Sequence, residues 1–471
     1  MTGTVPSAPD RPAEGMPPDG LPVPRRYIAM LAMAMALTMA VLDSSISNVA
    51  LPTIARDFGT SPAETIWVVN AYQLVIVAAL LPLASLGEII GYRRVYIAGL
   101  ALFTVGAGFC AMADSLPWLI AARILQGCGA AGVMSVNTAL VRFIYPSRHF
   151  GRALGLNSMV VAISAASGPT VAAAVLAVAP WPWLFAIHVP LGIATFFVAR
   201  AMPATPLGSH RFDLVSAALS ATTFGLLIIA IQGLSHDAGL HWVVAQFAAA
   251  AFAGWLLVRR QLSQTAPLLP VDLLRIPILA LSVATSVCSF TAQMLAYVSL
   301  PFHLQDALGR SPVQAGLLLT PWPLATAITS PIAGRLADRW PAGIVTSIGV
   351  ALMAIGLALL ATLPPAPNDA AIVWRMAVCG IGFGLFQSPN NRTMIGNTPV
   401  SRAGGASGML GTARLLGQSV GAALTALAFG LFAEAGIAAL TMGAGFAATA
   451  ALVSVSRLLP GVAARDGRPY G

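Results

Sequence analysis

Fourteen apolar segments follow one another along this chain, and only short polar connections separate them. A helix that crosses the hydrocarbon core of a bilayer needs about 20 apolar residues, whereas a strand of a membrane β-barrel needs about 10 residues of alternating polarity. The segments here have the length and continuous apolarity of helices. We therefore predict an all-α polytopic membrane protein with 14 transmembrane helices. The segments begin near Tyr27, Thr65, Val95, Trp118, Gly151, Trp183, Leu214, Trp242, Pro277, Val313, Gly343, Ala371, Ala403 and Gly436.

Arginines in the connections predict how the helices are oriented. About 20 arginines fall on one side of the predicted membrane and only Arg56 and Arg310 on the other, and the positive side is normally cytoplasmic. The formal net charge of +9 is therefore a topology signal rather than a nucleic-acid-binding surface. We expect a multi-pass protein of the cell (inner) membrane with both termini in the cytoplasm.

The charge rule does not decide whether the two segments between Asp213 and Arg259 cross the membrane. Their flanking connections are cytoplasmic whether both segments cross or neither does. Their apolarity, divided by the polar turn at residues 235–237, favours two crossings.

Two cytoplasmic turns resemble each other and indicate an internal repeat. Residues 86–94 join the second and third segments, residues 334–339 join two later ones, and each turn places an acid and arginines between helices. Arg123 likewise has a counterpart in Arg375. Two related six-helix halves explain this symmetry, which is typical of transporters with a site between the halves. The predicted parts are a disordered cytoplasmic tail (1–24), an N-terminal six-helix bundle (25–205), two additional transmembrane helices (206–262), a C-terminal six-helix bundle (263–458) and a cytoplasmic tail (459–471).

The charged residues of the two turns are candidates for locks that hold one conformation. The alternative is the ordinary positive charge of a cytoplasmic side, which explains the arginines but not the acids at matched positions. The candidate turn residues are Glu88, Gly91, Arg93, Arg94, Gly334, Arg335, Asp338 and Arg339.

One arginine, Arg123, lies deep inside the apolar segment 119–131. A charge at the centre of a bilayer is costly and normally faces a bundle interior or a water-filled cavity. At helical spacing Arg123, Gln126 and Asn137 share one face, while Gly127 and nearby glycines let other helices approach closely. Arg123 either locks helices together or takes part in a transport cycle.

Asp43 is the acid that we place well inside a segment. A low dielectric disfavours its charged form, and Arg123 would favour that form again if the two side chains lay close together. This opposition poises a carboxyl group to take up and release a proton. The alternative is a fixed ion pair between Asp43 and Arg123, which is weak evidence of stability.

Gly168 and Pro169 interrupt the fifth segment. Proline removes a helical hydrogen bond, so the helix should kink there, and the surrounding alanines suit close packing against a neighbour that moves. The kink is either a packing feature or part of the transport movement.

Further polar, charged and aromatic residues in the apolar segments are candidates to line a substrate cavity. Any one of them alone is more often an interhelical hydrogen-bonding residue. The candidates are Asn48, Asn70, Gln73, Gln126, Gln293, Tyr297, Trp322, Gln387, Asn390, Asn391 and Arg414.

No nucleotide-binding loop, metal-ligand cluster or nucleophile elbow is found in the sequence, and its four cysteines lie within apolar segments. We therefore expect no catalytic residues, no metal and no cofactor, and an ion gradient rather than ATP as the energy source.

Several motifs in the expected order resemble the major facilitator superfamily, and within it the fourteen-span drug:proton antiporters. Residues 42–52 are similar to the first-segment signature of that branch, and Arg123, Gln126 and Gly127 to the family's Arg-x-x-Gln-Gly pattern. Residues 167–170 resemble the Gly-Pro antiporter motif, and residues 304–316 also resemble this branch. Ala84, Glu88 and Ile89 depart from the family's turn pattern, and residues 172–173 are alanines where two glycines are usual.

The resemblance implies the major facilitator fold, with two six-helix bundles of inverted repeats and two extra central spans. It also implies a proton-coupled antiporter that exports small amphipathic or lipophilic compounds by alternating access, as in multidrug efflux and drug resistance. Asp43 and Arg123 would couple the proton. The expected partners are a small-molecule substrate, protons and the lipid bilayer, without nucleic acid or nucleotide, and the protein should be a monomer. The alternatives are an exporter of a single metabolite and a non-transporting sensor or assembly partner.

Overall fold

The computed structural model describes residues 20–146, 149–205, 207, 212–234, 240–263, 271–398 and 403–459. Within these ranges all regular secondary structure is helical, and thirteen helices are long and apolar enough to cross a membrane. The prediction of an all-α polytopic membrane protein is confirmed. The turn at residues 235–237 and most of both tails lie outside the described residues, and the boundaries of the two bundles stay a prediction.

The first half of the chain contributes six of these membrane-crossing segments. Two of them are composite, because α2 continues into α3 and α7 continues through α8 into a 3₁₀ turn. The elements are α1 (Arg25–Phe58), α2 (Pro62–Thr65), α3 (Trp67–Ile90), α4 (Tyr92–Ala111), α5 (Leu116–Ile144), α6 (Phe150–Leu176), α7 (Trp183–Ala186), α8 (His188–Val198) and η2 (Ala199–Ala201).

Two long helices follow, and the second half of the chain comes after them. α9 and α10 pack against each other, and α9 also contacts α3 and α16. The elements are α9 (Leu214–Gly233), α10 (Leu240–Leu262), η3 (Val271–Arg275), α11 (Pro277–Phe302), η4 (His303–Ala307), α12 (Pro312–Leu319), α13 (Pro321–Leu336), α14 (Ala342–Ala361), α15 (Asp369–Gly396), α16 (Ala403–Leu431) and α17 (Ala435–Ser456).

The segment predicted to begin near Val313 is divided into two helices. α12 has 8 residues and α13 has 16, and neither is long enough to count among the thirteen. The division falls at Thr320 and Pro321, because proline has no backbone N–H to continue the helical ladder. The count of fourteen crossings therefore stays a prediction.

The repeat between the two halves is visible in how corresponding helices begin. Ser61 caps α2 by accepting a hydrogen bond from the Glu64 backbone, and Ser311 caps α12 in the same way from Gln314. Both helices carry proline at their first position, where a missing N–H costs nothing. The same local pattern, a capping serine followed by proline, thus starts corresponding helices in both halves.

Close helix contacts repeat in the same way. In the first half, a methyl group on Gly129 of α5 would lie 2.2 Å from the backbone nitrogen of Phe103 in α4. In the second half, a methyl group on Gly382 of α15 would lie 2.5 Å from the nitrogen of Met353 in α14. Both pairs of helices therefore depend on glycine for backbone-to-backbone packing.

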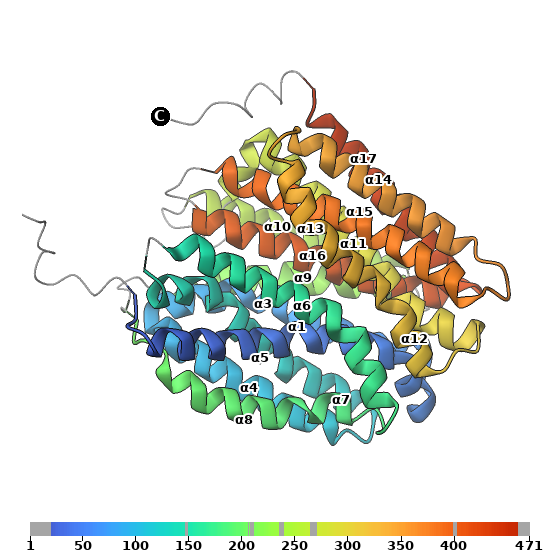
Figure 1. Cartoon of the computed structure of the whole chain (residues 1–471), viewed down its shortest axis with the longest axis horizontal. Coiled ribbons are helices and arrows are strands. Elements are labelled where there is room, and N and C mark those ends of the chain that lie inside the picture. The colour runs from blue at the N-terminus through green and yellow to red at the C-terminus, as the bar shows by residue number, and fades with distance from the viewer. Residues whose placement is uncertain are drawn as a thin grey trace, which may run out of the picture.

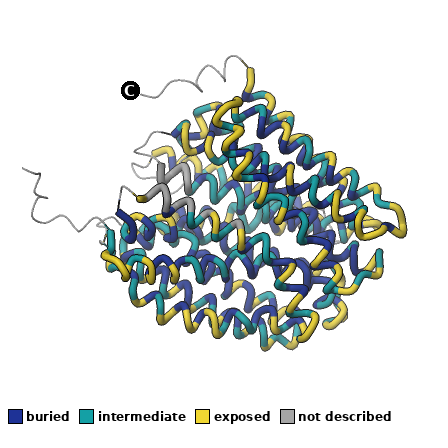
Figure 2. The backbone as a smooth tube through the Cα atoms, viewed as in Figure 1, coloured by how far each residue is buried: buried dark blue, intermediate teal, exposed yellow. Residues whose placement is uncertain are grey.

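The two halves lie side by side. In Figure 1, α1 to α8 occupy the lower part of the molecule and α13 to α17 the upper part, while α12 reaches beside the end of the first half. We call the end of the molecule where α1 stops at Phe58 and α12 starts at Pro312 the Phe58 end. Buried residues follow the inner sides of the helices, and exposed ones follow the outer sides and the turns (Figure 2).

Candidate functional site

Three buried side chains form a network between α1 and α5, which we call the Asp43 network. Arg123 Nη1 on α5 lies 2.6 Å from Asp43 Oδ2 on α1, and neither side chain is exposed. Gln126 Nε2 donates to Asp43 Oδ1 at 2.8 Å, and Gln126 Oε1 accepts from Arg123 Nη1 at 2.6 Å. Both carboxylate oxygens of Asp43 therefore have a donor, and the structure brings together residues that lie 80 positions apart.

Further contacts within the first half position Arg123. Its Nε donates to the backbone oxygen of Val68 on α3 at 3.0 Å. Its guanidinium carbon lies 4.1 Å from the centre of the Tyr72 ring and 5.4 Å from that of Phe185, at distances where cation–π attraction operates. Arg123 Nη2 is buried and has no hydrogen-bond partner among the described residues. The arginine is thus positioned by α3, α5 and α7, while Asp43 belongs to α1.

The Asp43 network can act chemically as a proton site. Its two charges cancel inside a low dielectric, and removing one partner of such a pair typically costs about 3–5 kcal/mol. Protonation of Asp43 would remove the attraction that links α1 to Arg123. A change in the charge of Asp43 would therefore change the packing of α1 against α5.

The Gly168–Pro169 motif lies where α6 meets α1. Pro169 leaves the backbone oxygen of Ala165, four residues earlier, without its helical donor, and the Ser45 hydroxyl lies 3.4 Å from that oxygen as a donor. A methyl group on Gly168 would lie 2.1 Å from Ser45 Oγ. Gly168 is therefore required for this close approach, and α6 continues as one helix through Pro169.

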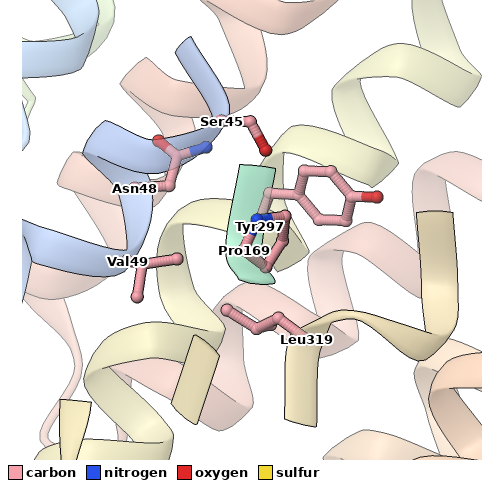
Figure 3. Close-up of a pocket in the computed structure, with 6 residues that line it drawn as sticks. All are labelled: Ser45, Asn48, Val49, Pro169, Tyr297 and Leu319. Carbon is pink, nitrogen blue, oxygen red and sulfur yellow. The ribbon is translucent and has the colours of Figure 1, made fainter. Parts of the chain in front are cut away.

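The two halves meet around a very small cavity beside this motif. Its volume is about 10 Å³, roughly the space of one water molecule, and Asn48, Tyr297 and Pro169 are among its walls (Figure 3). Gly316 of α12 packs against the Pro169 backbone, since a methyl group there would lie 2.7 Å from the Pro169 oxygen. The halves are thus in close contact at this level.

The Phe58 end is also closed by contacts between the halves. Gln305 of η4 donates to the Val49 backbone oxygen at 3.1 Å and accepts from Arg56 Nη2 at 2.9 Å. Arg56 Nη1 also lies 3.7 Å from the Asp306 carboxylate. We call these contacts the Phe58 latch. The sequence analysis did not single out Arg56 or Gln305 as functional, although Gln305 lies within the matched stretch 304–316.

The other cavity candidates are scattered rather than gathered at one site. Asn70 and Trp322 are buried, and their side-chain polar atoms have no partner in the described part of the chain. Gln73 donates to Ser44 at 3.2 Å, and Tyr297 packs edge-on against Trp322 at 5.2 Å between ring centres. The partly buried candidates are Gln293, Gln387, Asn391 and Arg414.

Asn390 belongs to a second buried cluster that the sequence analysis missed. Arg457, after the end of α17, is 2% exposed and donates to Asn390 Oδ1 at 2.8 Å and to Ser282 at 3.1 Å. It also donates to Thr285 and Ser454. This cluster ties α17 to α11 and α15. The sequence feature that could have indicated this cluster is Arg457, which follows Ser456 at the end of the last apolar segment.

Arg375 matches Arg123 in position but not in surroundings. It lies 6 residues after the start of α15, and Arg123 lies 7 residues after the start of α5. Arg375 is only partly buried, and it donates to the oxygen of Ala371 in its own helix at 2.8 Å. The two halves therefore share the position of an arginine, whereas the ion pair with Asp43 belongs to Arg123.

The turn residues make contacts within each half. Gly91 has a φ of 97° between α3 and α4, a conformation that favours glycine. Arg93 donates to the backbone oxygen of Arg200 at 3.2 Å, and Arg94 to that of Ile90. Asp338 pairs with Arg392 of α15. Glu88, Arg335 and Arg339 are exposed. The contacts of Arg93, Arg94 and Asp338 thus hold helices together within one half.

The sequence matches the family model of the Major Facilitator Superfamily over residues 33–422. The chain belongs to the Major Facilitator Superfamily. The solved structure of a bacterial homologue of the human lysosomal transporter Spinster shares the fold, with a TM-score of 0.63 at 17% identity over 92% of this chain and 96% of that one. The prediction of the major facilitator fold is confirmed, and members of this family are transporters rather than enzymes.

Three relatives cover most of the chain. It is 55% identical to the uncharacterized transporter YebQ of Escherichia coli K12, over 93% of this chain and 97% of YebQ. It is 30% identical to the riboflavin transporter RibZ of Clostridioides difficile, over 85% and 87% of the two chains. It is 29% identical to the multidrug efflux pump LfrA of Mycolicibacterium smegmatis, over 89% and 84%. This superfamily member is thus a multi-pass membrane transporter with small-molecule substrates.

Proposed function

We propose that this transporter is a proton-coupled antiporter that exports small amphipathic or lipophilic compounds by alternating access. The observation that carries the proposal is the Asp43 network, in which one carboxyl group and one arginine lie fully buried between two helices of the same half. A change in the protonation of Asp43 alters the attraction between α1 and α5, and so it can drive a conformational change. The similarity to LfrA, named as a multidrug efflux pump, supports export of varied compounds.

We assign the Phe58 end to the outside and both termini to the cytoplasm of the cell (inner) membrane, because the arginine-rich connections lie at the opposite end. In that orientation the Phe58 latch closes the outer side, so the conformation described is not open to the outside. We further propose that the fourteen-span topology applies and that the protein works as a monomer without cofactor or nucleotide.

A second candidate is an exporter of one metabolite. The similarity to RibZ, which is named as a riboflavin transporter, favours it. The two candidates differ in how many compounds cause proton release when the protein transports them.

Both candidates can be tested with everted membrane vesicles that contain the transporter. A pH-sensitive dye reports proton release when compounds from a panel are added. Release with several unrelated amphipathic compounds supports multidrug export, and release with a single compound supports the dedicated exporter. No release with any compound would overturn proton-coupled antiport.

A further inference from the structure

Arg414 is a second arginine in the middle of a membrane-crossing helix, and its surroundings differ from those of Arg123. It lies 11 residues after the start of α16, which corresponds to about 16 Å along the helix axis. The residues on either side of it, Ala413 and Leu415, are buried, whereas Arg414 is partly exposed. Arg414 therefore lies too far from the helix start to be an ordinary cytoplasmic arginine, although its residue is not fully enclosed by the described part of the chain.

The neighbours of α16 show where Arg414 points. A methyl group on Gly417 would lie 2.5 Å from the backbone oxygen of Val287, so this side of α16 packs on α11. Gly411 lies nearest to Leu80, so that side of α16 faces α3. At about 100° per residue, Arg414 lies about 60° from Gly417 and about 60° from Gly411, between the two contacts.

The opposite side of α16 is covered by α9. Ala423 packs in a cluster with Ile228 and Ile231, and it lies about 180° around the helix from Arg414. Arg414 therefore points into the region between α11 of the second half and α3 of the first half, away from α9. This region is the interface between the halves, where the substrate path of such transporters lies.

The charges of the described spans leave Arg414 uncompensated. Arg123 is neutralised by Asp43, and Arg375 donates a hydrogen bond within its own helix. Arg414 has no hydrogen-bond or ion-pair partner in the described ranges of the chain. Intramembrane charges are costly, and they usually mark the path of a substrate or an ion. A positive charge that points into the interface, and that has no partner among the described residues, suits an anionic ligand.

We infer that Arg414 binds an anionic group of the transported compound, so that the substrates are small amphipathic organic acids. This inference rests on the proposed export function and adds the chemical class of its substrate. A guanidinium group presents parallel N–H donors that match both oxygens of a carboxylate or sulfonate. Apolar residues of α3 and α16 that pack in one cluster at this interface, Leu80 and Leu415 among them, suit the apolar body of such an acid.

The test compares three acids with their neutral amides: 1-naphthoate with 1-naphthamide, salicylate with salicylamide, and decanoate with decanamide. Binding to the purified full-length protein in detergent is measured by titration calorimetry against a blank of detergent alone. The variants are Arg414→Gln, Arg414→Lys and the matched control Arg375→Gln, which removes the other partly buried intramembrane arginine. Size-exclusion profiles and thermal unfolding check that each variant is folded.

The wild type and Arg375→Gln should bind at least one acid about tenfold more tightly than its amide. Arg414→Gln should lose this preference, and Arg414→Lys should keep part of it, because lysine keeps the charge but not the fork of donors. Equal binding of acids and amides by the wild type, binding of none of the acids, or an unchanged preference in Arg414→Gln would each overturn the inference.

Binding in detergent needs no proton gradient, so this result is independent of antiport. If the wild type prefers an acid but releases no protons with any compound, the proposed antiport fails and the anion site at Arg414 stands. If protons are released only with neutral or cationic compounds, the antiport stands and the anion site fails.

Discussion

Replacing Arg123 by methionine tests whether the Asp43 network is held by charge. Methionine is apolar and unbranched, but it removes both hydrogen bonds that Arg123 Nη1 makes to Asp43 and Gln126. Asp43 then keeps only the Gln126 Nε2 donor, in a site with no exposed side-chain surface. The carboxyl group must either stay charged without its partner or take a proton.

The size of the effect follows from these two choices. Leaving a buried carboxylate unpaired costs about 3–5 kcal/mol. Holding a proton that the unfolded chain has released costs more as the pH rises, by up to about 1.36 kcal/mol per pH unit. The folded variant then holds a proton that the unfolded chain has released, so its stability falls as the pH rises. The deficit in unfolding free energy should therefore shrink by up to about 2.7 kcal/mol, two pH units at about 1.36 kcal/mol each, between pH 7 and pH 5.

The assay is denaturant unfolding in detergent micelles at both pH values, for wild type, Arg123→Met and the double variant Asp43→Asn/Arg123→Met. The double variant has no acid at the site, so its difference from wild type should change little with pH. At pH 7 it should be more stable than Arg123→Met. An Arg123→Met deficit of the same size at both pH values, or a double variant less stable than the single one, would refute the reasoning.

Three further predictions concern the contacts between helices and the topology. Gly168→Ala should lower export by more than tenfold in vesicle assays, because its methyl group meets the Ser45 side chain. Adding Ser45→Gly to the same chain should restore export, and a failure to restore it would contradict this contact. Gln305→Ala removes two hydrogen bonds of the Phe58 latch, which are worth about 2–4 kcal/mol together. A cysteine at position 48 should then react faster with an impermeant reagent added from outside, and an unchanged rate would argue against the latch. Cysteines at positions 236 and 259 should be labelled from outside and inside respectively, and protection of position 236 from outside would contradict two crossings between Asp213 and Arg259.

The positions of the helices could be predicted from the sequence alone. Every predicted start lies within three residues of an observed helix start, the largest differences being Thr65 against Pro62 and Val95 against Tyr92. Bilayer thickness fixes the length of each apolar run, and proline and serine mark where many of them begin. The break at Pro321 was missed because the apolar pattern continues through it.

The partners of the buried polar residues could be predicted only in part. The adjacency of Asp43 and Arg123 followed from the family resemblance, since 80 residues separate them. Gln126 was singled out as a cavity residue, but the structure places it against the carboxylate of Asp43. Asn390 and Arg457 lie 67 residues apart, and nothing in local periodicity connects them. Periodicity assigns a residue to a helix face, whereas its partner depends on how the helices pack.

Proton coupling at Asp43 is tested most directly by substrate-induced proton release in proteoliposomes. The measurement compares wild type, Asp43→Asn and the control Asp114→Asn, which removes an exposed acid outside the Asp43 network. Asparagine preserves the shape of the side chain and leaves nothing to titrate, so Asp43→Asn should still fold but lose at least 90%, or about tenfold, of the release, while Asp114→Asn keeps it. Full proton release and export by Asp43→Asn would show that the proton travels elsewhere and that Asp43 is a structural partner of Arg123.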